Sequence, residues 1–193
     1  MSGNLARVHD WSMAVLKKTG IRLAHPEILD LVKKHGVKVS GEIAYFEEEQ
    51  LMGWVHQAPG DFKVYGRNPK YDMIIGKRGA EFAPGYGAPM IADFDGVKRA
   101  ALYQDYIDFV KLVHQSNHFN INGGILVQPA DLSPNESFPL MLFAALTLSD
   151  KCLIGGAGGE EEAKTVMEML GIVFGGKEEL RQKPRIIGLI STS

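Results

Sequence analysis

One pattern occurs three times along the chain: a short apolar run ends in glycine, asparagine or serine where a strand would end. The three copies lie about 33 residues apart, a spacing that fits successive strand–helix units, and they are found at 118–125, 151–159 and 185–191. In the middle copy, a glycine-rich turn at 155–159 separates the apolar run from a segment with helical periodicity at 160–170. The pattern therefore predicts three parallel strands in sequence order, near 119–124, 151–156 and 185–190, joined by helices.

The first hundred residues have a different organisation. Apolar positions at helical spacing predict three helices, at 5–19, 26–36 and 47–58. Segment 37–46 is typical of a hairpin. From 61 to 100 the apolar period changes to two, which predicts a small antiparallel subdomain with strands at 62–65, 72–75, 81–83, 89–93 and 97–99. Further helices are predicted at 102–115 and 133–149, the second with Ser133 and Glu136 as a capping box.

Parallel strands joined by single helices form either an open doubly wound sheet or a closed barrel. A dinucleotide-binding turn has the pattern G-x-G-x-x-G, whereas the glycine turn here continues into Glu160 and Glu161, whose charges would repel a pyrophosphate. The barrel is therefore favoured. Because a barrel needs about 250 residues and the chain has 193, we expect the N-terminal part of a TIM (β/α)8 barrel from a longer protein. A helical and antiparallel β cap region is expected at 1–115 and the first, truncated βα units of the barrel at 116–193, packed as one unit.

Composition and charge disfavour several classes of function. The net charge is −2 and the basic residues are spread along the chain, so nucleic acid is not an expected partner. No apolar run is long enough to cross a membrane, and residues 1–10 do not resemble a signal sequence, which predicts a cytoplasmic protein. Cys152 is the single cysteine, so there is no disulfide framework and no C-x-x-C metal site. Its apolar surroundings indicate a packed side chain and not a reactive thiol.

Two histidines have the spacing of metal ligands. His114 and His118 are four residues apart, which would place both imidazoles on one face of a helix, as in zinc sites. A third ligand and the glutamate of an H-E-x-x-H motif are missing, and a strand is expected to begin near His118. We therefore predict no metal site and interpret the pair as polar residues at a helix end.

The ends of the predicted strands supply the candidate site, because residues at the carboxyl ends of barrel strands line the active site. The residues at these positions are Asn122 and Gly123, Gly156 and Ala157, and Ser191 and Ser193. Asn122 has two possible roles. Its amide could donate a hydrogen bond to a substrate carboxylate, or it could hydrogen-bond neighbouring backbone groups. Gln128, just past the first strand, is a weaker candidate of the same kind. These patterns assign no catalytic residue.

Six short motifs occur in an order that resembles the start of the trimethylamine methyltransferase family, and together they cover essentially the whole chain. They are 19–22 (TGIR), 35–39 (HGVKV), 65–69 (YGRNP), 82–89 (FAPGYGAP), 127–131 (VQPAD) and 191–193 (STS). Members of this family are barrel enzymes that move a methyl group from a methylated amine to the cobalt of a corrinoid. The corrinoid is carried on a partner protein.

The resemblance implies a methyltransferase that acts on trimethylamine or on a quaternary amine such as glycine betaine. A cognate corrinoid protein would supply the corrinoid, because the chain has no cobalamin-ligating D-x-H-x-x-G stretch and is expected to bind no cofactor directly. Trimethylamine enzymes of the family carry pyrrolysine at a position downstream of this chain, so both branches of the family stay open. The complete enzyme is expected to form a homo-oligomer.

The implied substrate also makes Tyr86 a candidate. A quaternary amine is a cation without a hydrogen-bond donor, so its site needs aromatic faces for cation–π attraction. Glycines on both sides of Tyr86 let the loop approach a ligand closely, although a surface turn has the same composition and stays open as an interpretation. The predicted substrate-binding residues are therefore Tyr86, Asn122, Gly123, Gly156, Gln128 and Ser191.

Two functions of other classes stay open. A catalytically incomplete barrel fragment would act only as a binding or scaffold module, and the missing barrel strands favour it. An unrelated barrel enzyme, such as a lyase, would be favoured by a metal bound near His114.

Overall fold

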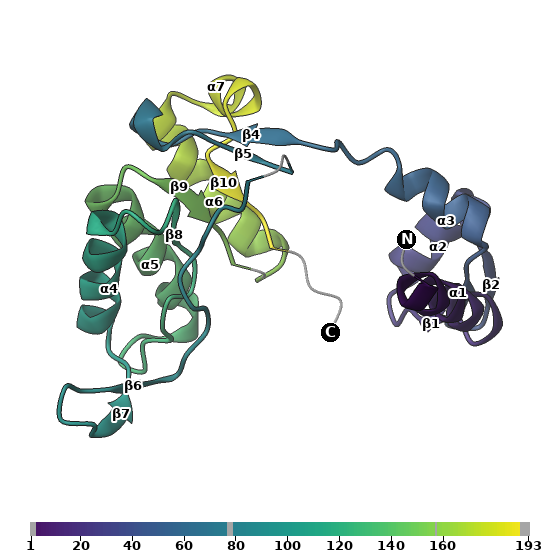
Figure 1. The fold of residues 1–193 in the computed structure, drawn as a ribbon, viewed down its shortest axis with the longest axis horizontal. Helices are drawn as coiled ribbons and strands as arrows, with labels where there is room; N and C mark the ends of the chain where they lie inside the picture. Colours follow the sequence, from purple (N-terminus) through teal and green to yellow (C-terminus); the bar gives the residue numbers. More distant parts are fainter. Residues whose placement is uncertain (1–2, 77–78, 157, 190–193) are drawn as a thin grey trace. The chain divides into compact units, whose positions relative to one another are not determined.

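The computed structural model describes residues 3–76, 79–156 and 158–189, and it shows a mixed α/β fold with several small sheets (Figure 1). The chain divides after Pro59 into two compact units, residues 1–59 and 60–193. This division falls earlier than position 115, because the hairpins between 60 and 100 are hydrogen-bonded to the parallel sheet or to its loops. The cap at 1–115 and the barrel units at 116–193, packed as one unit, stay a prediction for the complete protein.

The first unit combines helices with a small antiparallel sheet. Its elements are α1 (Gly3–Lys18), β1 (Ile21–Arg22), α2 (Pro26–Lys34), β2 (Lys38–Ser40), β3 (Ile43–Tyr45) and α3 (Glu48–Val55). The helices and the β2–β3 hairpin confirm the sequence prediction, whereas β1, which extends the sheet to the order β1-β3-β2, was not predicted. Gly20 turns the chain from α1 into β1 with a φ of +74°, and a Cβ there would lie 2.6 Å from the carbonyl oxygen of Ala44. The turn therefore requires glycine.

Two separate hairpins come first in the second unit. One joins β4 (Phe62–Val64) to β5 (Met73–Ile75) across a 3-10 turn at Pro69–Tyr71, and the other joins β6 (Met90–Ala92) to β7 (Lys98–Ala100). The prediction of one antiparallel subdomain was wrong, because β4–β5 and β6–β7 form two separate two-stranded sheets.

The strand predicted at 81–83 was also wrong, since these described residues have no strand assignment. The backbone of this segment is instead hydrogen-bonded to the start of the first parallel strand. The carbonyl oxygen of Phe82 accepts a hydrogen bond of 3.1 Å from the backbone N–H of Asn120 and one of 3.4 Å from that of Ile121.

A parallel sheet with the order β10-β9-β8 forms the centre of the second unit. Its strands are β8 (Ile121–Gly123), β9 (Cys152–Ile154) and β10 (Ile186–Ile187). Asn122 pairs with Leu153, and Leu153 pairs with Ile186, so the three predicted strands are parallel, adjacent and in sequence order, as expected. The strands that the structure describes form an open sheet, and the barrel stays a prediction for the complete protein.

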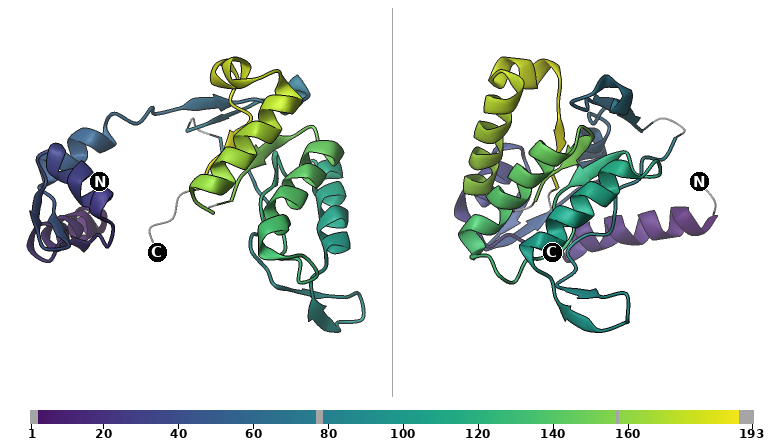
Figure 2. Two further views of the ribbon diagram at one scale, coloured as in Figure 1. Left: turned by 180° about the vertical axis from the view of Figure 1, so that it is seen from behind. Right: turned by 90° about the vertical axis from the view of Figure 1, so that its left-hand side faces the viewer.

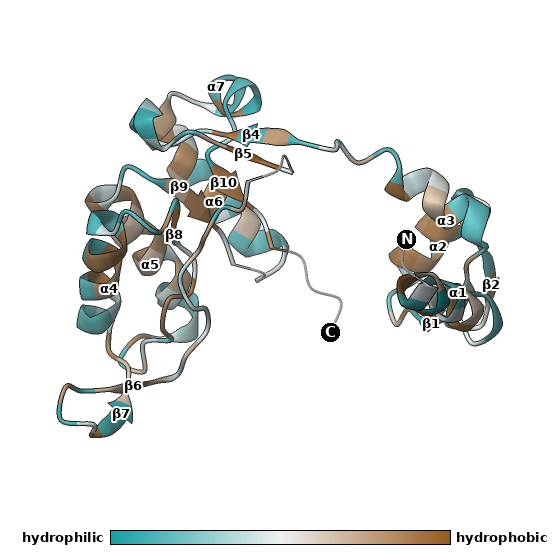
Figure 3. Ribbon diagram, viewed as in Figure 1, coloured by the Kyte–Doolittle hydropathy of each residue, from teal (hydrophilic) through white to brown (hydrophobic). Residues whose placement is uncertain are grey.

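Helices α4 (Tyr103–Gln115), α5 (Pro134–Leu148) and α6 (Glu160–Phe174) lie side by side along one face of this sheet (Figure 2). The short helix α7 (Lys177–Gln182), which was not predicted, follows α6 and is mostly hydrophilic (Figure 3). The predicted capping box of α5 does not form, because the hydroxyl of Ser133 donates to the carboxylate of Glu136 at 2.5 Å and caps no backbone N–H. None of the described helices is long and apolar enough to span a membrane.

The main core lies between the sheet and the three helices. Fully buried Tyr106 and Val110 of α4 pack there with Leu153 of β9 and Leu170 of α6. Side chains alternate between the two faces of a strand, so residues next to Leu153 point to the other face. Cys152 is therefore found in a second, smaller cluster, which includes Val64, Met73 and Ile121. It is fully buried, and burial raises the pKa of its thiol to about 12, as suits a packed side chain.

The β4–β5 hairpin lies against the amino ends of β9 and β10. The backbone N–H of Tyr65 donates to the carbonyl oxygen of Pro184 at 2.8 Å, and that of Asn68 donates to Asp150 at 3.3 Å. Both acceptors precede these strands in the sequence. The hairpin therefore covers the end of the sheet opposite to the carboxyl ends, where parallel sheets bind their ligands.

Lys151, at the amino end of β9, is a buried cation that sequence patterns did not reveal. It is only 3% exposed, and its Nζ donates to the carbonyl oxygens of Val113, Ser116 and Phe119, each at 2.6 Å. Carbonyl groups in the last turn of a helix have no intrahelical partner, so the ammonium group satisfies the end of α4. Burial lowers the pKa of this amine.

Candidate functional site

Tyr86 lies at the carboxyl ends of β8 and β9, where it is hydrogen-bonded to Gly155, 69 residues later in the sequence. Its hydroxyl donates to the carbonyl oxygen of Gly155, directly after β9, at 3.1 Å. Its ring lies over Gly124, directly after β8, where a Cβ would be 2.7 Å from the Cε2 of Tyr86 and 2.8 Å from the Cγ2 of Ile154. Gly124 also has a φ of +68°. Both its conformation and the space above it therefore require glycine.

The loop that carries Tyr86 is bonded to the segment after β8. The backbone N–H of Gly87 donates to the carbonyl oxygen of Ile125 at 2.6 Å, and that of Gln128 donates to Ala88 at 2.9 Å. Ala88 and Val127 form a parallel β-bridge. These bonds hold the loop along the sheet, so its geometry differs from that of a free surface turn. The role of Tyr86 in binding stays a prediction.

Tyr86 is 41% exposed as a residue, so the protein covers one part of it and another part is open to solvent. Burial raises the pKa of its hydroxyl, and the charge of Glu162 raises it further. The hydroxyl is consequently protonated at neutral pH and can donate to Gly155.

Tyr86 also lines a cavity of about 450 Å³. The rest of the lining is apolar and includes β6 together with Phe109 and Val113 of α4. A cavity of this size and polarity suits a small organic ligand.

Asn122 points away from Tyr86, toward α4. It is fully buried, its Nδ2 donates to the carbonyl oxygen of Val110 at 3.0 Å, and its Oδ1 accepts from the N–H of Gly123 at 2.8 Å. Gly123 is buried with a φ of +80°. Of the two roles that the sequence left open, the amide of Asn122 performs the backbone-satisfying one here, and it fixes the shape of the β8 end. Contact of Asn122 or Gly123 with a substrate stays a prediction.

Gly156 belongs to a turn that is filled by a carboxylate of the chain itself. The N–H of Gly158 donates to Oε1 of Glu162 at 3.0 Å, and a Cβ at Gly156 would contact that same oxygen. The same Cβ would lie 2.9 Å from the ring of Phe138. Because the carboxylate of Glu162 accepts an N–H of this turn, its negative charge would repel a phosphate placed there. Sequence reasoning noted the acidic helix start but did not single out Glu162.

Of the remaining candidates, one has an exposed side chain and the others cannot be placed. Gln128 is exposed, and its backbone pairs with Ala88. Ser191, Ala157 and Ser193 lie outside the described residues. The structure thus brings Tyr86 together with the turn that contains Gly156, while the side chain of Asn122 lies on the other face of the sheet.

The two histidines do not form a pair. His114 lies in α4, where its ring contacts Tyr71 edge-on at 5.9 Å and its Nδ1 is 3.4 Å from the hydroxyl of Ser149. His118 is exposed and lies beyond the last residue of that helix, so the imidazoles do not share a helix face. Across 3–76, 79–156 and 158–189, no group of three or more His, Cys, Asp or Glu residues is placed to hold a metal ion.

Comparison with known proteins adds independent findings. A family model described as trimethylamine methyltransferase (MTTB) matches residues 2–193. The chain is 34% identical to the glycine betaine methyltransferase of Desulfitobacterium hafniense (strain Y51) over 186 residues, which are 96% of this chain and 39% of that protein.

Two further relatives are more distant. The trimethylamine methyltransferase MttB of Desulfitobacterium hafniense (strain DSM 10664 / DCB-2) is 23% identical over 185 residues, covering 93% of this chain and 37% of that protein. The L-carnitine:corrinoid methyltransferase of Eubacterium limosum is 24% identical over 143 residues, covering 74% of this chain and 29% of that protein. The chain therefore spans 39% or less of the length of these relatives.

Proposed function

Because the chain belongs to the trimethylamine methyltransferase family, we propose that the complete protein moves a methyl group from a methylated amine to the cobalt of a corrinoid protein. The amine is trimethylamine or a quaternary amine such as glycine betaine. The relatives' names support this proposal, since they specify glycine betaine, trimethylamine and L-carnitine as substrates and, in one case, a corrinoid as acceptor.

The single observation that carries the proposed site is the position of Tyr86 over Gly124, with its hydroxyl bonded to Gly155. A methylated ammonium group spreads its charge over its methyl groups, and a quaternary one has no N–H to donate. The face of an aromatic ring attracts such a cation electrostatically, with about 0.5–2 kcal/mol per contact. The hydrogen bond to Gly155 supports the proposal, because it fixes the ring before a ligand arrives.

The role of the chain in the reaction is binding, orientation and exclusion of water. The corrinoid enters as a substrate on another protein and supplies a strongly nucleophilic reduced cobalt. The bond between the methyl carbon and nitrogen breaks with its electron pair left on nitrogen, and the acceptor donates the pair for the new bond to carbon. A quaternary amine therefore leaves as a neutral tertiary amine. Trimethylamine reacts as the trimethylammonium ion and leaves as neutral dimethylamine, so in both cases no side chain has to supply a proton.

Three further properties are proposed for the complete protein. The parallel strands, in sequence order with helices along one face, support continuation of the sheet into a (β/α)8 barrel. A cytoplasmic location and assembly into a homo-oligomer stay predictions.

Turnover by the complete protein tests the proposal. The protein is incubated with reduced corrinoid protein and with trimethylamine, glycine betaine or L-carnitine in turn, and methylated cobalt is followed by its absorbance. We expect methylation with one of these amines and release of the amine with one methyl group fewer. Binding of an amine without any methyl transfer would instead support the binding module.

A further inference from the structure

The β6–β7 hairpin presents an aromatic side chain that the described residues of this chain leave uncovered. Its turn spans 93–97, and Phe94 at the tip is fully exposed. Met90 and Val97 of the same hairpin are also exposed. An apolar tip of this kind is costly to leave in water, and buried aromatic side chains often anchor protein–protein interfaces.

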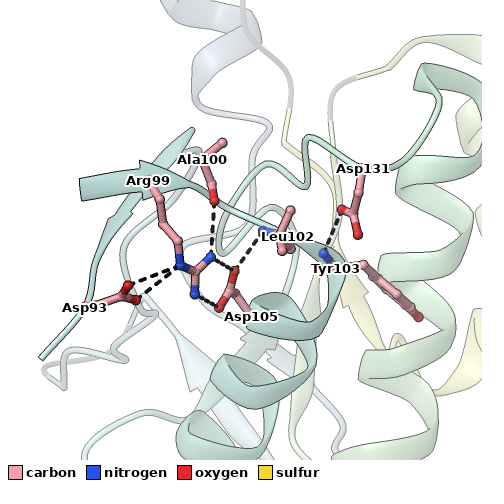
Figure 4. A network of polar contacts seen from close by, with 7 residues as sticks. All are labelled: Asp93, Arg99, Ala100, Leu102, Tyr103, Asp105 and Asp131. Atoms are coloured by element: carbon pink, nitrogen blue, oxygen red, sulfur yellow. Dashed lines mark hydrogen bonds and ion pairs between the residues drawn. The ribbon is translucent and has the colours of Figure 1, made fainter. Parts of the chain in front are cut away.

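A network of charges holds the base of this hairpin (Figure 4). The guanidinium of Arg99 donates through both terminal nitrogens to the carboxylate of Asp105, at 2.7 and 2.8 Å, and its Nε lies 3.2 Å from Asp93. Asp105 in turn accepts the N–H of Leu102 at 2.8 Å, at the start of α4. Such a bidentate pair fixes orientation as well as distance. The hairpin is therefore tied to α4 at its base.

The same region is bonded to the loop after β8. Asp131 accepts the N–H of Tyr103 at 2.8 Å (Figure 4), and the N–H of Ala130 donates to Ala101 at 2.8 Å. Ala101 follows β7 and Tyr103 begins α4, so the base of the hairpin is bonded to the loop that follows the carboxyl end of β8. The tip is thus presented on a fixed base.

The hairpin is also continuous with the proposed amine site. Residues Met90, Ile91 and Ala92 of β6 line the same cavity of about 450 Å³ as Tyr86. The backbone between them is held by the bridge from Ala88 to Val127. The hairpin therefore forms part of the rim beside Tyr86, and the β4–β5 hairpin lies at the opposite end of the parallel strands.

We propose that the β6–β7 hairpin, with Phe94 at its tip, is a docking element for the protein that carries the methyl acceptor. This inference rests on the proposed function. Methyl transfer requires the acceptor atom to reach bonding distance of the methyl carbon, so the protein that carries the acceptor has to cover the rim around Tyr86. A second copy of the chain seated on the same rim would block that approach, which favours the acceptor protein as the occupant.

In the complete protein, kinetics with two methyl acceptors distinguish protein docking from methyl transfer itself. One acceptor is a corrinoid protein that the parent methylates, which has to dock, and the other is free reduced cobalamin, which does not. We expect Phe94→Ser to raise the KM for the corrinoid protein by about tenfold, the size typical of one lost interface anchor. The rate with free cobalamin should equal that of the parent. Because Phe94 is fully exposed among the described residues, the substitution removes no packing within them.

Ile172 provides a matched control, since it is an exposed apolar residue near the end of α6 that lies outside the cavity and the hairpin. Ile172→Ser should leave the KM for both acceptors unchanged.

Parent-like kinetics of Phe94→Ser with the corrinoid protein would overturn the docking role, and so would an equal loss of activity with both acceptors. A parent dimer that dissociates only in Phe94→Ser during sedimentation would assign the tip to a second copy. If the parent methylates neither acceptor, the proposed function fails and this partner fails with it.

Discussion

The substitution of Tyr86 tests the proposed amine site most quantitatively. Tyr86→Ala removes the ring from above Gly124 together with the hydrogen bond to Gly155. One cation–π contact contributes about 0.5–2 kcal/mol, which corresponds to a rise in Kd of about 2- to 30-fold. Since the residue is 41% exposed, solvent weakens the attraction, and a value in the lower half of this range is expected.

Tyr86→Phe separates the ring from its hydroxyl. The ring face survives, so the affinity for the amine should change much less than in Tyr86→Ala. Loss of the bond to Gly155 should lower the free energy of unfolding by about 0.5–1.5 kcal/mol. Calorimetric titration of the complete protein with glycine betaine and with trimethylamine measures the first effect, and urea unfolding measures the second.

Tyr103→Phe is the matched control for the hydroxyl. Tyr103 also donates to a backbone carbonyl, that of Leu140 at 2.9 Å, but it does not line the cavity beside Tyr86. It should lose a similar amount of stability and bind both amines like the parent. The account is refuted if Tyr86→Ala and Tyr86→Phe both bind the amines as the parent does.

Three more substitutions test the framework around this site. Gly124→Ala should lower the free energy of unfolding by at least about 1 kcal/mol, because a residue with a Cβ is strained at positive φ. It should also weaken amine binding by displacing the ring of Tyr86. An unchanged urea midpoint would contradict the close approach of the Tyr86 ring to Gly124. Lys151→Met should lower the free energy of unfolding by about 1–3 kcal/mol, since three carbonyl oxygens between the last turn of α4 and the start of β8 lose their donor. An unchanged urea midpoint would show that water replaces the ammonium group without cost. Burial raises the pKa of Tyr106, whose hydroxyl donates to Gly124 at 2.9 Å. The unfolded chain therefore releases this proton near pH 10 while the folded chain keeps it, so the free energy of unfolding should fall as pH rises above 10. Tyr106→Phe should reduce that fall. Identical pH profiles of parent and variant would contradict the raised pKa of Tyr106.

The order of the parallel strands could be predicted from the sequence because it depends on local patterns. Each apolar run is followed by its own turn, and the repeat at a constant spacing implies helical crossovers. The strand predicted at 81–83 failed for the opposite reason. Its alternation of residues suits a strand, but the backbone of Phe82 bonds to Asn120 and Ile121, and that partner is set by long-range packing.

The candidate site was predictable only in part. The composition of its loop marked Tyr86, yet the bond to Gly155 joins residues 69 positions apart and has no local signal. The sequence also could not decide which face of β8 carries Asn122, since a shift of one residue exchanges the two faces. Lys151 escaped notice because its partners are backbone carbonyls, which every residue has.

A crystal structure of the complete protein with glycine betaine tests the central claim most directly. The trimethylammonium group should lie within about 6 Å of the ring centroid of Tyr86, at the carboxyl ends of β8 and β9. An amine bound elsewhere, with no ligand on the open face of Tyr86, would contradict the account.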